Sequence, residues 1–262
     1  MGSVITLTTD FAARDGYQAV LEGIIAGINP RAKVITITHD LEPGDVAGGW
    51  YLLKTHYRYF PPRTVHLAIV DPGVGGRRKM LAVQTAAAFM IGPDNGLLSF
   101  IPRREIVSIR SITNRKYALS QVSPVFQGRD IMAPAAAYLS LGIDPACLGP
   151  KCRAMVALPK GKPARTRLGI KGGILWIDRF GNLISTIEAD LAAKGKDVMV
   201  DGTSIGPLRR TFSDVRSGEP VAYIGSGGHL EIAVRDGSAL EFFSACRGDD
   251  TEILVVASEK RR

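Results

Sequence analysis

The chain has 262 residues, more than the commonest domain size, so it can form one or two domains with ordinary hydrophobic cores. Hydrophobic residues make up 45% and charged residues 22%, as in a soluble globular protein. No apolar run approaches the roughly 20 residues of a membrane span, and the first residues lack a secretory signal, so we expect a cytoplasmic protein with no membrane partner.

The net charge of +8 raises nucleic acid as a possible partner. Much of the excess lies at 151–171 and in the tail 260–262, and neither stretch interleaves aromatic residues with its charges as single-strand-binding surfaces do. We therefore rank an RNA-associated protein below a protein that binds a small molecule. The three cysteines cannot all pair within one chain, and no His, Cys or carboxylate cluster has metal-ligand spacing, so we expect reduced thiols and no metal site.

The first part of the chain alternates strand-like and helix-like segments. A strand is predicted at 4–8, and apolar residues at helical spacing predict a helix at 17–28, with Asp15 able to cap its start. Further strands are predicted at 34–38, 65–70, 81–84 and 106–112, and further helices at 45–57 and 129–141. Such βαβ alternation predicts an α/β domain whose mostly parallel sheet is flanked by helices.

The sequence changes character at 158–168, where prolines, a glycine and basic residues gather as in an exposed linker. Short strands are then predicted at 173–177, 183–187, 198–200, 221–224, 230–234 and 253–256, with one short helix at 189–194. Glycine-containing turns separate most of these strands, as in a small all-β barrel or sandwich. We therefore expect an α/β N-terminal domain at 1–157, a linker at 158–168 and a β C-terminal domain at 169–262.

The stretch VDPGVGGRR at 70–78 follows a predicted strand and is a candidate site, because open α/β proteins bind ligands outside the carboxyl ends of their strands. A Walker phosphate loop is excluded, since the G-x-x-x-x-G-K-[ST] pattern is missing. A dinucleotide-type turn lacks its helix, because the following MLAVQT at 80–85 alternates like a strand. For the loop taken alone, a plain hairpin turn with solvated arginines stays possible.

Five other stretches place polar residues where a packed core would not: TDF at 9–11, GPDNG at 92–96, FQGRD at 126–130, DRFGN at 178–182 and GSGGHLE at 225–231. With the loop at 70–78, they resemble the S-adenosyl-L-methionine hydroxide adenosyltransferases, relatives of fluorinase and chlorinase, over nearly the whole chain. The resemblance implies a barrel-like C-terminal domain and a homotrimer with active sites between the N-terminal domain of one subunit and the C-terminal domain of the next. It also implies that S-adenosyl-L-methionine is the substrate, which water or hydroxide splits into adenosine and L-methionine without a cofactor.

Carried over to matching positions, the resemblance implies a substrate-binding set. Asp10 would hold the ribose hydroxyls, and Asn182 would read the adenine edge. Asp178 would face the methionine ammonium and Ser226 its carboxylate. The other predicted contacts are Phe11, Trp50, Asn95 and Phe180. Core packing suits Trp50 better than a substrate contact, and the stretch at 178–182 also suits a tight turn.

The implied catalytic residues are Asp71, Arg78 and Gln127. In hydrolytic members of the family an aspartate, an arginine and a histidine surround the attacking water, and Asp71 and Arg78 match the first two. Gln127 stands where the histidine is expected. Glutamine cannot titrate, although its amide can orient water. We therefore predict a hydrolase that is slowed or has a different pH dependence.

Two alternatives to hydrolysis stay open. If Gln127 abolishes turnover, the chain would bind S-adenosyl-L-methionine without reaction. Halide transfer is the less favoured alternative: Gly128 resembles the glycine of the chlorinase motif, but the carboxylate of Asp71 would repel a halide.

Overall fold

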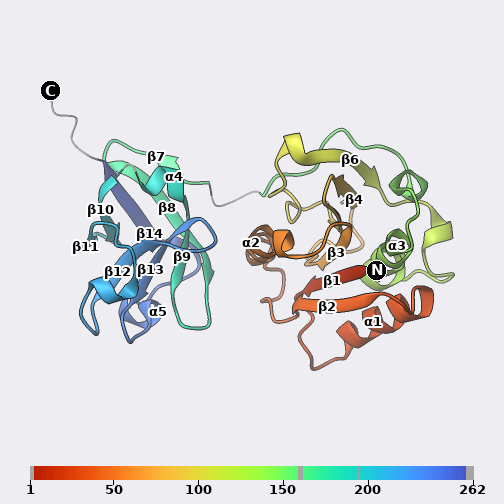
Figure 1. Cartoon of the computed structure of the whole chain (residues 1–262), viewed down its shortest axis with the longest axis horizontal. Helices are drawn as coiled ribbons and strands as arrows, with labels where there is room; N and C mark the ends of the chain where they lie inside the picture. Colours follow the sequence, from red (N-terminus) through yellow and green to blue (C-terminus); the bar gives the residue numbers. More distant parts are fainter. Residues whose placement is uncertain (1–2, 159–161, 194, 258–262) are drawn as a thin grey trace. The chain divides into compact units, whose positions relative to one another are not determined.

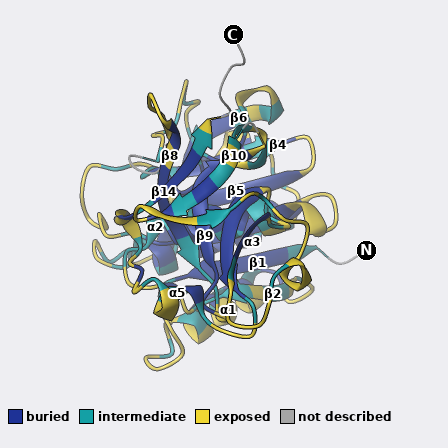
Figure 2. Cartoon of the chain, turned by 90° about the vertical axis from the view of Figure 1, so that its left-hand side faces the viewer, coloured by how far each residue is buried: buried dark blue, intermediate teal, exposed yellow. Residues whose placement is uncertain are grey.

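The computed structural model describes residues 3–158, 162–193 and 195–257 (Figure 1). The chain divides into two compact units, Met1–Pro159 and Lys160–Arg262. Each unit has its own sheet, and the central strands of both sheets are largely buried, whereas strands at the sheet edges are more exposed (Figure 2). Parts of three predicted segments lie outside the described residues: 159–161 of the linker, 194 of the short helix and the basic tail at 260–262.

The first unit is built on a six-stranded sheet with the order β2-β1-β3-β5-β4-β6. Its strands are β1 (Val4–Thr9), β2 (Lys33–Thr38), β3 (Thr64–Ile69), β4 (Met80–Thr85), β5 (Ala88–Pro93) and β6 (Ile106–Ser111). Strands β2, β1, β3 and β5 are parallel, while β4 is antiparallel to both of its neighbours. The predicted α/β domain with a mostly parallel sheet is therefore confirmed, and β5 is a strand that the sequence analysis did not predict.

Three helices flank this sheet: α1 (Tyr17–Ile28), α2 (Val46–His56) and α3 (Ala133–Ser140). The predicted cap by Asp15 is wrong, because α1 begins after Gly16, which has a φ of 71° and no side-chain cap. The predicted helix at 129–141 has two parts, a π-helical turn over Gly128–Met132 and then α3. The short 3-10 segments are Tyr57–Tyr59, Arg103–Glu105, Arg115–Tyr117, Pro145–Leu148 and Phe212–Asp214.

Alternation along β1 shows why both faces of the sheet are covered. Ile5 and Leu7 pack in the main core of the first unit with Leu21 and Ile25 of α1. Thr6 points to the opposite face, since successive strand residues alternate, and there its hydroxyl pairs with Nδ1 of buried His66 at 2.8 Å. A sheet buried on both faces holds its strand ends in fixed positions, which is what a site at those ends requires.

The second unit is an antiparallel sheet with the order β11-β10-β14-β8-β9-β13-β12 and with β7 paired to β8. Its elements are β7 (Ala164–Arg165), β8 (Gly169–Ile177), β9 (Leu183–Glu188), α4 (Ala189–Ala192), β10 (Gly195–Val200), β11 (Thr203–Gly206), β12 (Pro220–Ile224), β13 (His229–Val234), α5 (Ala239–Phe242) and β14 (Gly248–Ala257). The chain after β11 reaches β12, where Arg209 N donates to Ala222 O at 2.8 Å. The sheet is thus nearly closed into a barrel, as predicted, and not opened into a sandwich.

Candidate active site

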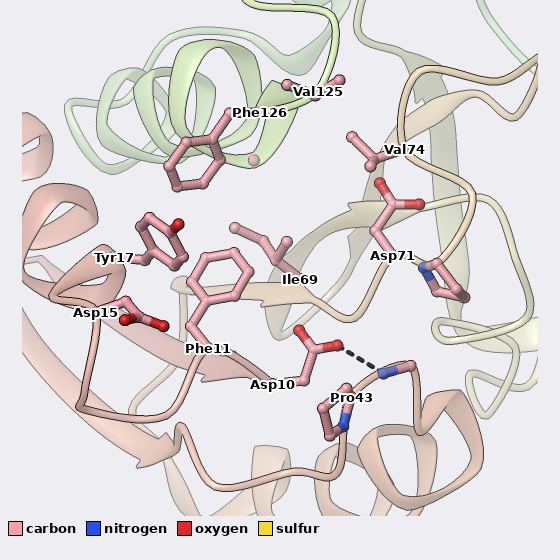
Figure 3. Close-up of a pocket in the computed structure, with 13 residues that line it drawn as sticks. Asp10, Phe11, Asp15, Tyr17, Pro43, Ile69, Asp71, Val74, Val125 and Phe126 are labelled. Carbon is pink, nitrogen blue, oxygen red and sulfur yellow. Dashed lines mark hydrogen bonds between the residues drawn. The ribbon is translucent and has the colours of Figure 1, made fainter.

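A pocket of about 490 Å³ opens in the first unit at the carboxyl ends of β1, β2 and β3 (Figure 3). From β1 the chain passes to β2 on one side and then crosses to β3 on the other. Such a switch point between parallel strands is where open α/β sheets bind ligands. Asp10 directly follows β1, Pro43 and Gly44 lie in the loop after β2, and Asp71 lies two residues after β3; all four line the pocket.

Asp10 is fixed on one side and faces the pocket on the other (Figure 3). Its Oδ2 accepts a hydrogen bond from Gly44 N at 2.8 Å. Burial raises the pKa of Asp10, the Gly44 N–H opposes that shift, and the charges of Asp71 and Asp45 add to it. A carboxylate held by one backbone amide keeps free acceptor sites for a ligand hydroxyl.

Asp71 and Arg78 form a nearly buried ion pair within the loop 70–78. Their side chains are 5% and 10% exposed. Arg78 Nε donates to both Asp71 oxygens, at 2.8 and 2.9 Å, and Arg78 Nη2 also donates to Oδ2. This forked contact sets the direction of the carboxylate.

The loop 70–78 is a compact double turn. Val74 N donates to Asp71 O at 3.2 Å, and Gly76 N donates to Gly73 O at 3.0 Å. Gly75 has a φ of 80°, and a Cβ there would come 3.2 Å from Pro124 O. The loop is not a hairpin, because β5 lies between β3 and β4 in the sheet.

Three aromatic rings form one wall of the pocket (Figure 3). Phe11, Tyr17 and Phe126 meet edge to face, with centroids 5.2 to 5.9 Å apart. Phe11 is a predicted substrate contact, whereas Tyr17 is predicted only as part of a helix. The signal available for Tyr17 was its position as the first residue of the helix that follows the TDF stretch. This wall will be called the aromatic wall.

Gln127 does not line this pocket. It lines a second cavity of about 370 Å³ with residues such as Met80, Ile112 and Asn114. Its Oε1 is buried, and no described group donates a hydrogen bond to it. Its neighbour Gly128 does line the first pocket, and a Cβ at Gly128 would come 3.0 Å from Ile69. The catalytic role of Gln127 stays a prediction.

Two predicted substrate contacts lie away from the pocket lining. Asn95 Nδ2 donates to Val70 O at 2.8 Å, and its Oδ1 accepts from Leu97 N at 3.2 Å, so its amide braces the start of the loop 70–78. Trp50 lies on α2, with Lys54 Nζ 4.9 Å from its ring centroid. Its indole Nε1 is buried, with no hydrogen-bond partner among the described residues.

The second unit places Asp178, Phe180 and Asn182 in one tight turn. The Asp178 carboxylate accepts from Phe180 N and Asn182 N at 2.9 Å and from Asn182 Nδ2 at 2.8 Å. Gly181 has a φ of 79°, and a Cβ there would collide with Ser238 Oγ at 2.1 Å. Phe180 is 75% exposed, so the turn presents an aromatic ring beside two polar side chains.

Ser226 lies exposed in the turn 225–228 of the same unit. The turn is closed by Gly228 N, which donates to Gly225 O at 3.0 Å. Buried Glu231 packs against Gly225, where a Cβ would come 1.8 Å from Glu231 Oε1. Tyr223 OH donates to Glu231 Oε2 at 2.9 Å. Burial raises the pKa of Glu231; the Tyr223 hydrogen bond opposes the shift, and the charge of Asp178 adds to it.

Metal-ligand clusters and membrane-spanning helices are both absent from the described residues. Across 3–158, 162–193 and 195–257, no three His, Cys, Asp or Glu side chains gather as metal ligands. Within the same ranges no helix has the length and apolar character needed to cross a membrane.

Family models match both units. Residues 5–149 match the SAM hydroxide adenosyltransferase N-terminal domain, and residues 172–252 match the C-terminal domain of the same family. A protein of Thermus thermophilus named (R)-S-adenosyl-L-methionine hydrolase is 39% identical over 94% of this chain and 97% of its own length. One of Salinispora tropica with the same name is 36% identical, over 96% and 97%.

A more distant relative and a solved structure also match nearly the whole chain. A fluorinase of Actinopolyspora mzabensis is 24% identical over 91% of this chain and 92% of its own length. The crystal structure of an uncharacterized conserved protein from Thermotoga maritima superposes with a TM-score of 0.87 at 34% identity, over 95% of this chain and 99% of that one.

Proposed function

The chain belongs to the S-adenosyl-L-methionine hydroxide adenosyltransferase family, and on this premise we propose that it hydrolyses S-adenosyl-L-methionine to adenosine and L-methionine. The observation that most supports the proposal is that Asp71 and Asp10 line one pocket, while Arg78, which does not line it, holds the Asp71 carboxylate. Relatives named as hydrolases align with this chain over nearly its whole length.

The reaction is a displacement at C5′ of the ribose. The water oxygen forms a bond to C5′, the C5′–sulfur bond breaks, and its electron pair leaves with neutral methionine. One water proton must be released, which gives adenosine its 5′-hydroxyl. Asp71 can orient the attacking water through an acceptor site that Arg78 leaves free, and Arg78 holds the Asp71 carboxylate in place for that contact.

The charge of the pocket favours a cationic substrate over an anionic nucleophile. Asp10, Asp15 and Asp71 line it, and the lining drawn from the described residues contains no basic side chain. Arg78 neutralises one of these charges through its contact with Asp71. The remaining field attracts a sulfonium ion and repels a halide, so hydrolysis ranks above halide transfer.

We further infer that the polar groups of the second unit bind the rest of the substrate. Asn182 would read the adenine edge, Asp178 would bind the methionine ammonium and Ser226 would bind its carboxylate. We also infer a homotrimer with the substrate bound between subunits, for which sedimentation equilibrium should give three times the mass of one chain.

The first test is product formation in chloride-free buffer made with H₂¹⁸O. We expect adenosine with ¹⁸O at its 5′-hydroxyl, and unlabelled methionine, because the oxygen comes from water. We also expect Gln127→His to be about tenfold or more faster if its imidazole turns from the second cavity toward the reacting water, since a group that titrates near neutrality adds acid–base catalysis. If neither protein forms adenosine but both bind S-adenosyl-L-methionine, the chain is a binding protein; a halide-dependent 5′-halo product would indicate halide transfer instead.

The role of Asp10 predicts a pH-dependent affinity for adenosine, a product that can be titrated without turnover. Only the ionised carboxylate accepts from both ribose hydroxyls. Because the pKa of Asp10 is raised, binding should weaken on acidification at a higher pH than for an ordinary aspartate. We expect Asp10→Asn to bind adenosine about tenfold or more weakly and to lose this pH dependence, as measured by calorimetry.

Asp15→Asn is the matched control for Asp10, because it removes the same charge from an exposed carboxylate in the same pocket. It should change the affinity for adenosine by less than about threefold. 2′-Deoxyadenosine should bind the wild type more weakly than adenosine does. The Asp10→Asn variant should bind the two nucleosides with equal affinity. Equal losses in the Asp10 and Asp15 variants would mean that only the pocket's net charge matters.

A further inference from the structure

The loop 123–130 supplies part of the pocket wall and is closed by one buried carboxylate. Asp130 is 1% exposed, and it accepts from Ser123 N, at the far end of the loop, at 2.7 Å. It also accepts from Arg129 Nε at 2.6 Å and from Arg129 Nη2 at 3.0 Å. Burial raises the pKa of Asp130, but these hydrogen bonds outweigh burial and hold the pKa below its usual range. Asp130 is therefore ionised at neutral pH.

Arg129 extends this fixed geometry to the aromatic wall. Its guanidinium carbon lies 4.7 Å from the centroid of the Phe126 ring. A planar guanidinium held by two hydrogen bonds has little freedom to turn, so the ring that it covers is restrained as well. Phe126 in turn meets Tyr17 at 5.2 Å and Phe11 at 5.8 Å.

The backbone at this place is also unusual. Gly128–Met132 is a π-helical turn, a rare geometry that often marks functional sites. Phe126 and Gly128 line the pocket, whereas Arg129 and Asp130 do not. The Arg129 side chain is 35% exposed, and an ion pair that reaches solvent adds little net stability, so this pair is better explained by the residues that it orders.

We propose that Asp130 is a positioning residue for the reaction: through Arg129 it holds Phe126 in the aromatic wall, and this wall places the substrate beside Asp71. The inference rests on the proposed hydrolysis at this pocket. Phe126 contacts the substrate, and Asp130 acts only through Arg129 and Phe126. Asp130 serves the placement of the reacting carbon and not the binding of the substrate as such. Its loss should therefore lower mainly kcat.

The test is a double-mutant cycle on kcat for adenosine formation. Asp130→Asn keeps the shape of the side chain and an acceptor for Ser123 N, but it loses the charge that aligns Arg129. We expect kcat to fall about tenfold or more, with KM changed less. In a Phe126→Leu background the same change should lower kcat by no more than about twofold, because the ring through which Asp130 acts is gone. If the kcat losses of Asp130→Asn and Phe126→Leu multiply in full in the double variant, the inference is wrong.

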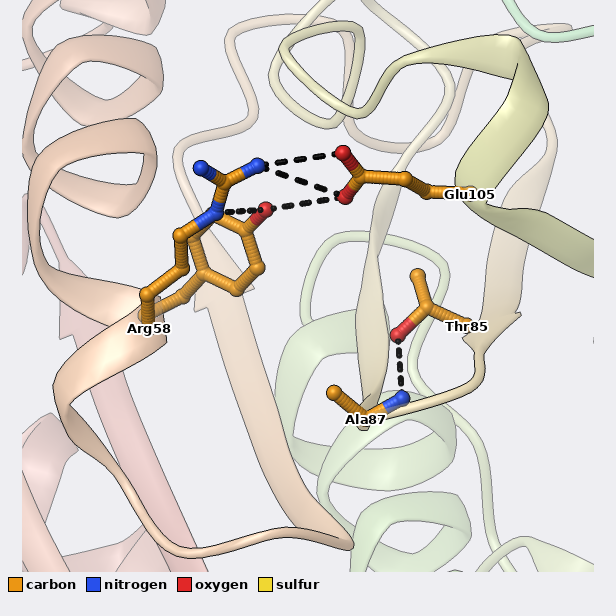
Figure 4. Close-up of polar contacts among 5 residues, drawn as sticks. Arg58, Thr85, Ala87 and Glu105 are labelled. Carbon is orange, nitrogen blue, oxygen red and sulfur yellow. Dashed lines mark hydrogen bonds and ion pairs between the residues drawn. The ribbon is translucent and has the colours of Figure 1, made fainter.

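Two further variants separate positioning from folding. Arg129→Lys keeps the positive charge but not the planar fork, and it should show the same dependence on Phe126. Glu105→Gln removes a carboxylate from another arginine pair in the same unit, where Arg58 Nη2 lies 3.1 Å from Glu105 Oε1 (Figure 4). Neither residue of that pair lines the pocket, so kcat should stay unchanged.

The behaviour of the wild type distinguishes a failure of the proposed hydrolysis from a failure of the positioning role of Asp130. If the wild type forms adenosine and the cycle shows no coupling, the inference is wrong and the proposed function stands. If the wild type binds S-adenosyl-L-methionine without turnover, the proposed hydrolysis fails, and the inference fails with it because the positioning serves that reaction. If the wild type neither binds nor reacts, the proposed function fails, and the inference fails with it.

Discussion

Replacing Asp71 with asparagine should lower kcat for adenosine formation by about 10²-fold or more. Asp71 is the one pocket carboxylate that an arginine fixes at both oxygens. The amide of asparagine keeps one acceptor but loses the charge, so it can neither favour proton loss from water nor hold Arg78 in a fork. The two losses affect the chemical step, and KM should change less than kcat.

The stability of this variant must be measured with its rate. Removing the charge leaves Arg78, whose side chain is 10% exposed, without its carboxylate. Breaking a buried pair on one side typically costs about 3–5 kcal/mol. Thermal unfolding should therefore show a lower Tm, and the assay belongs well below that temperature. The double variant Asp71→Asn/Arg78→Gln should recover part of the Tm and none of the activity.

Glu105→Gln is the matched control, since it removes the same kind of partner from Arg58 in a much more exposed pair, with side chains 66% (Arg58) and 31% (Glu105) exposed (Figure 4). Exposed pairs contribute about 0–1 kcal/mol, so both Tm and kcat should stay close to the wild type. If Asp71→Asn keeps more than about a third of wild-type kcat, the attacking water is not oriented by Asp71, and the catalytic site must be sought elsewhere in the pocket.

The sequence predicted the parts of the fold that follow from regular periodicity. Alternation of residue types in β1 and helical spacing of apolar residues in α1 both gave correct elements, although β1 is buried on both faces. Strand β5 was missed: its run at 88–93 is apolar throughout and follows β4 after two alanines. Thr85 Oγ1 accepts from Ala87 N at 3.2 Å in that turn (Figure 4), which is a local side-chain contact with no strong turn signature.

The sequence predicts which motifs contribute to the site, but it does not predict the directions of their side chains. The position of Asp10 and Asp71 at neighbouring strand ends follows from parallel topology. The direction of the Gln127 side chain depends on backbone turns at 123–130 that no periodicity encodes. The bracing role of Asn95 likewise depends on Val70 O, which lies 25 residues earlier in the chain. Tertiary contacts of this kind decide which polar residue in a motif reaches the pocket.

The first unit should lose about 2 kcal/mol of stability between pH 7.5 and pH 5 because of His66 alone. Burial lowers the pKa of His66 from 6.5 to about 4 in the folded protein. Its Nδ1 pairs with Thr6 Oγ1 at 2.8 Å, and its Nε2 is buried with no partner among the described residues. A proton on Nε2 would therefore place an unsolvated charge beside the ring of Phe60, which lies 5.4 Å away.

The direction of this stability change follows from the protons bound by the folded and unfolded states. Between pH 6.5 and about 4 the unfolded state binds more protons at this histidine than the folded state does, so the free energy of unfolding falls as the pH falls. His66→Asn keeps a group that can pair with Thr6 but cannot titrate. This variant should be less stable at pH 7.5, yet it should lose less stability on acidification. The wild-type minus variant difference isolates His66 from the carboxyls that titrate in the same range.

The measurement is urea unfolding followed by tryptophan fluorescence at the two pH values. The chain has two tryptophans, one in each unit, so a Trp176→Phe background lets Trp50 report on the first unit alone. His56→Gln is the control, because His56 is exposed in the same unit, and it should leave the pH dependence of stability unchanged. If the wild type and His66→Asn lose equal stability, the folded state accommodates a charged His66, and the face of the sheet beneath Tyr57 and Phe60 admits water.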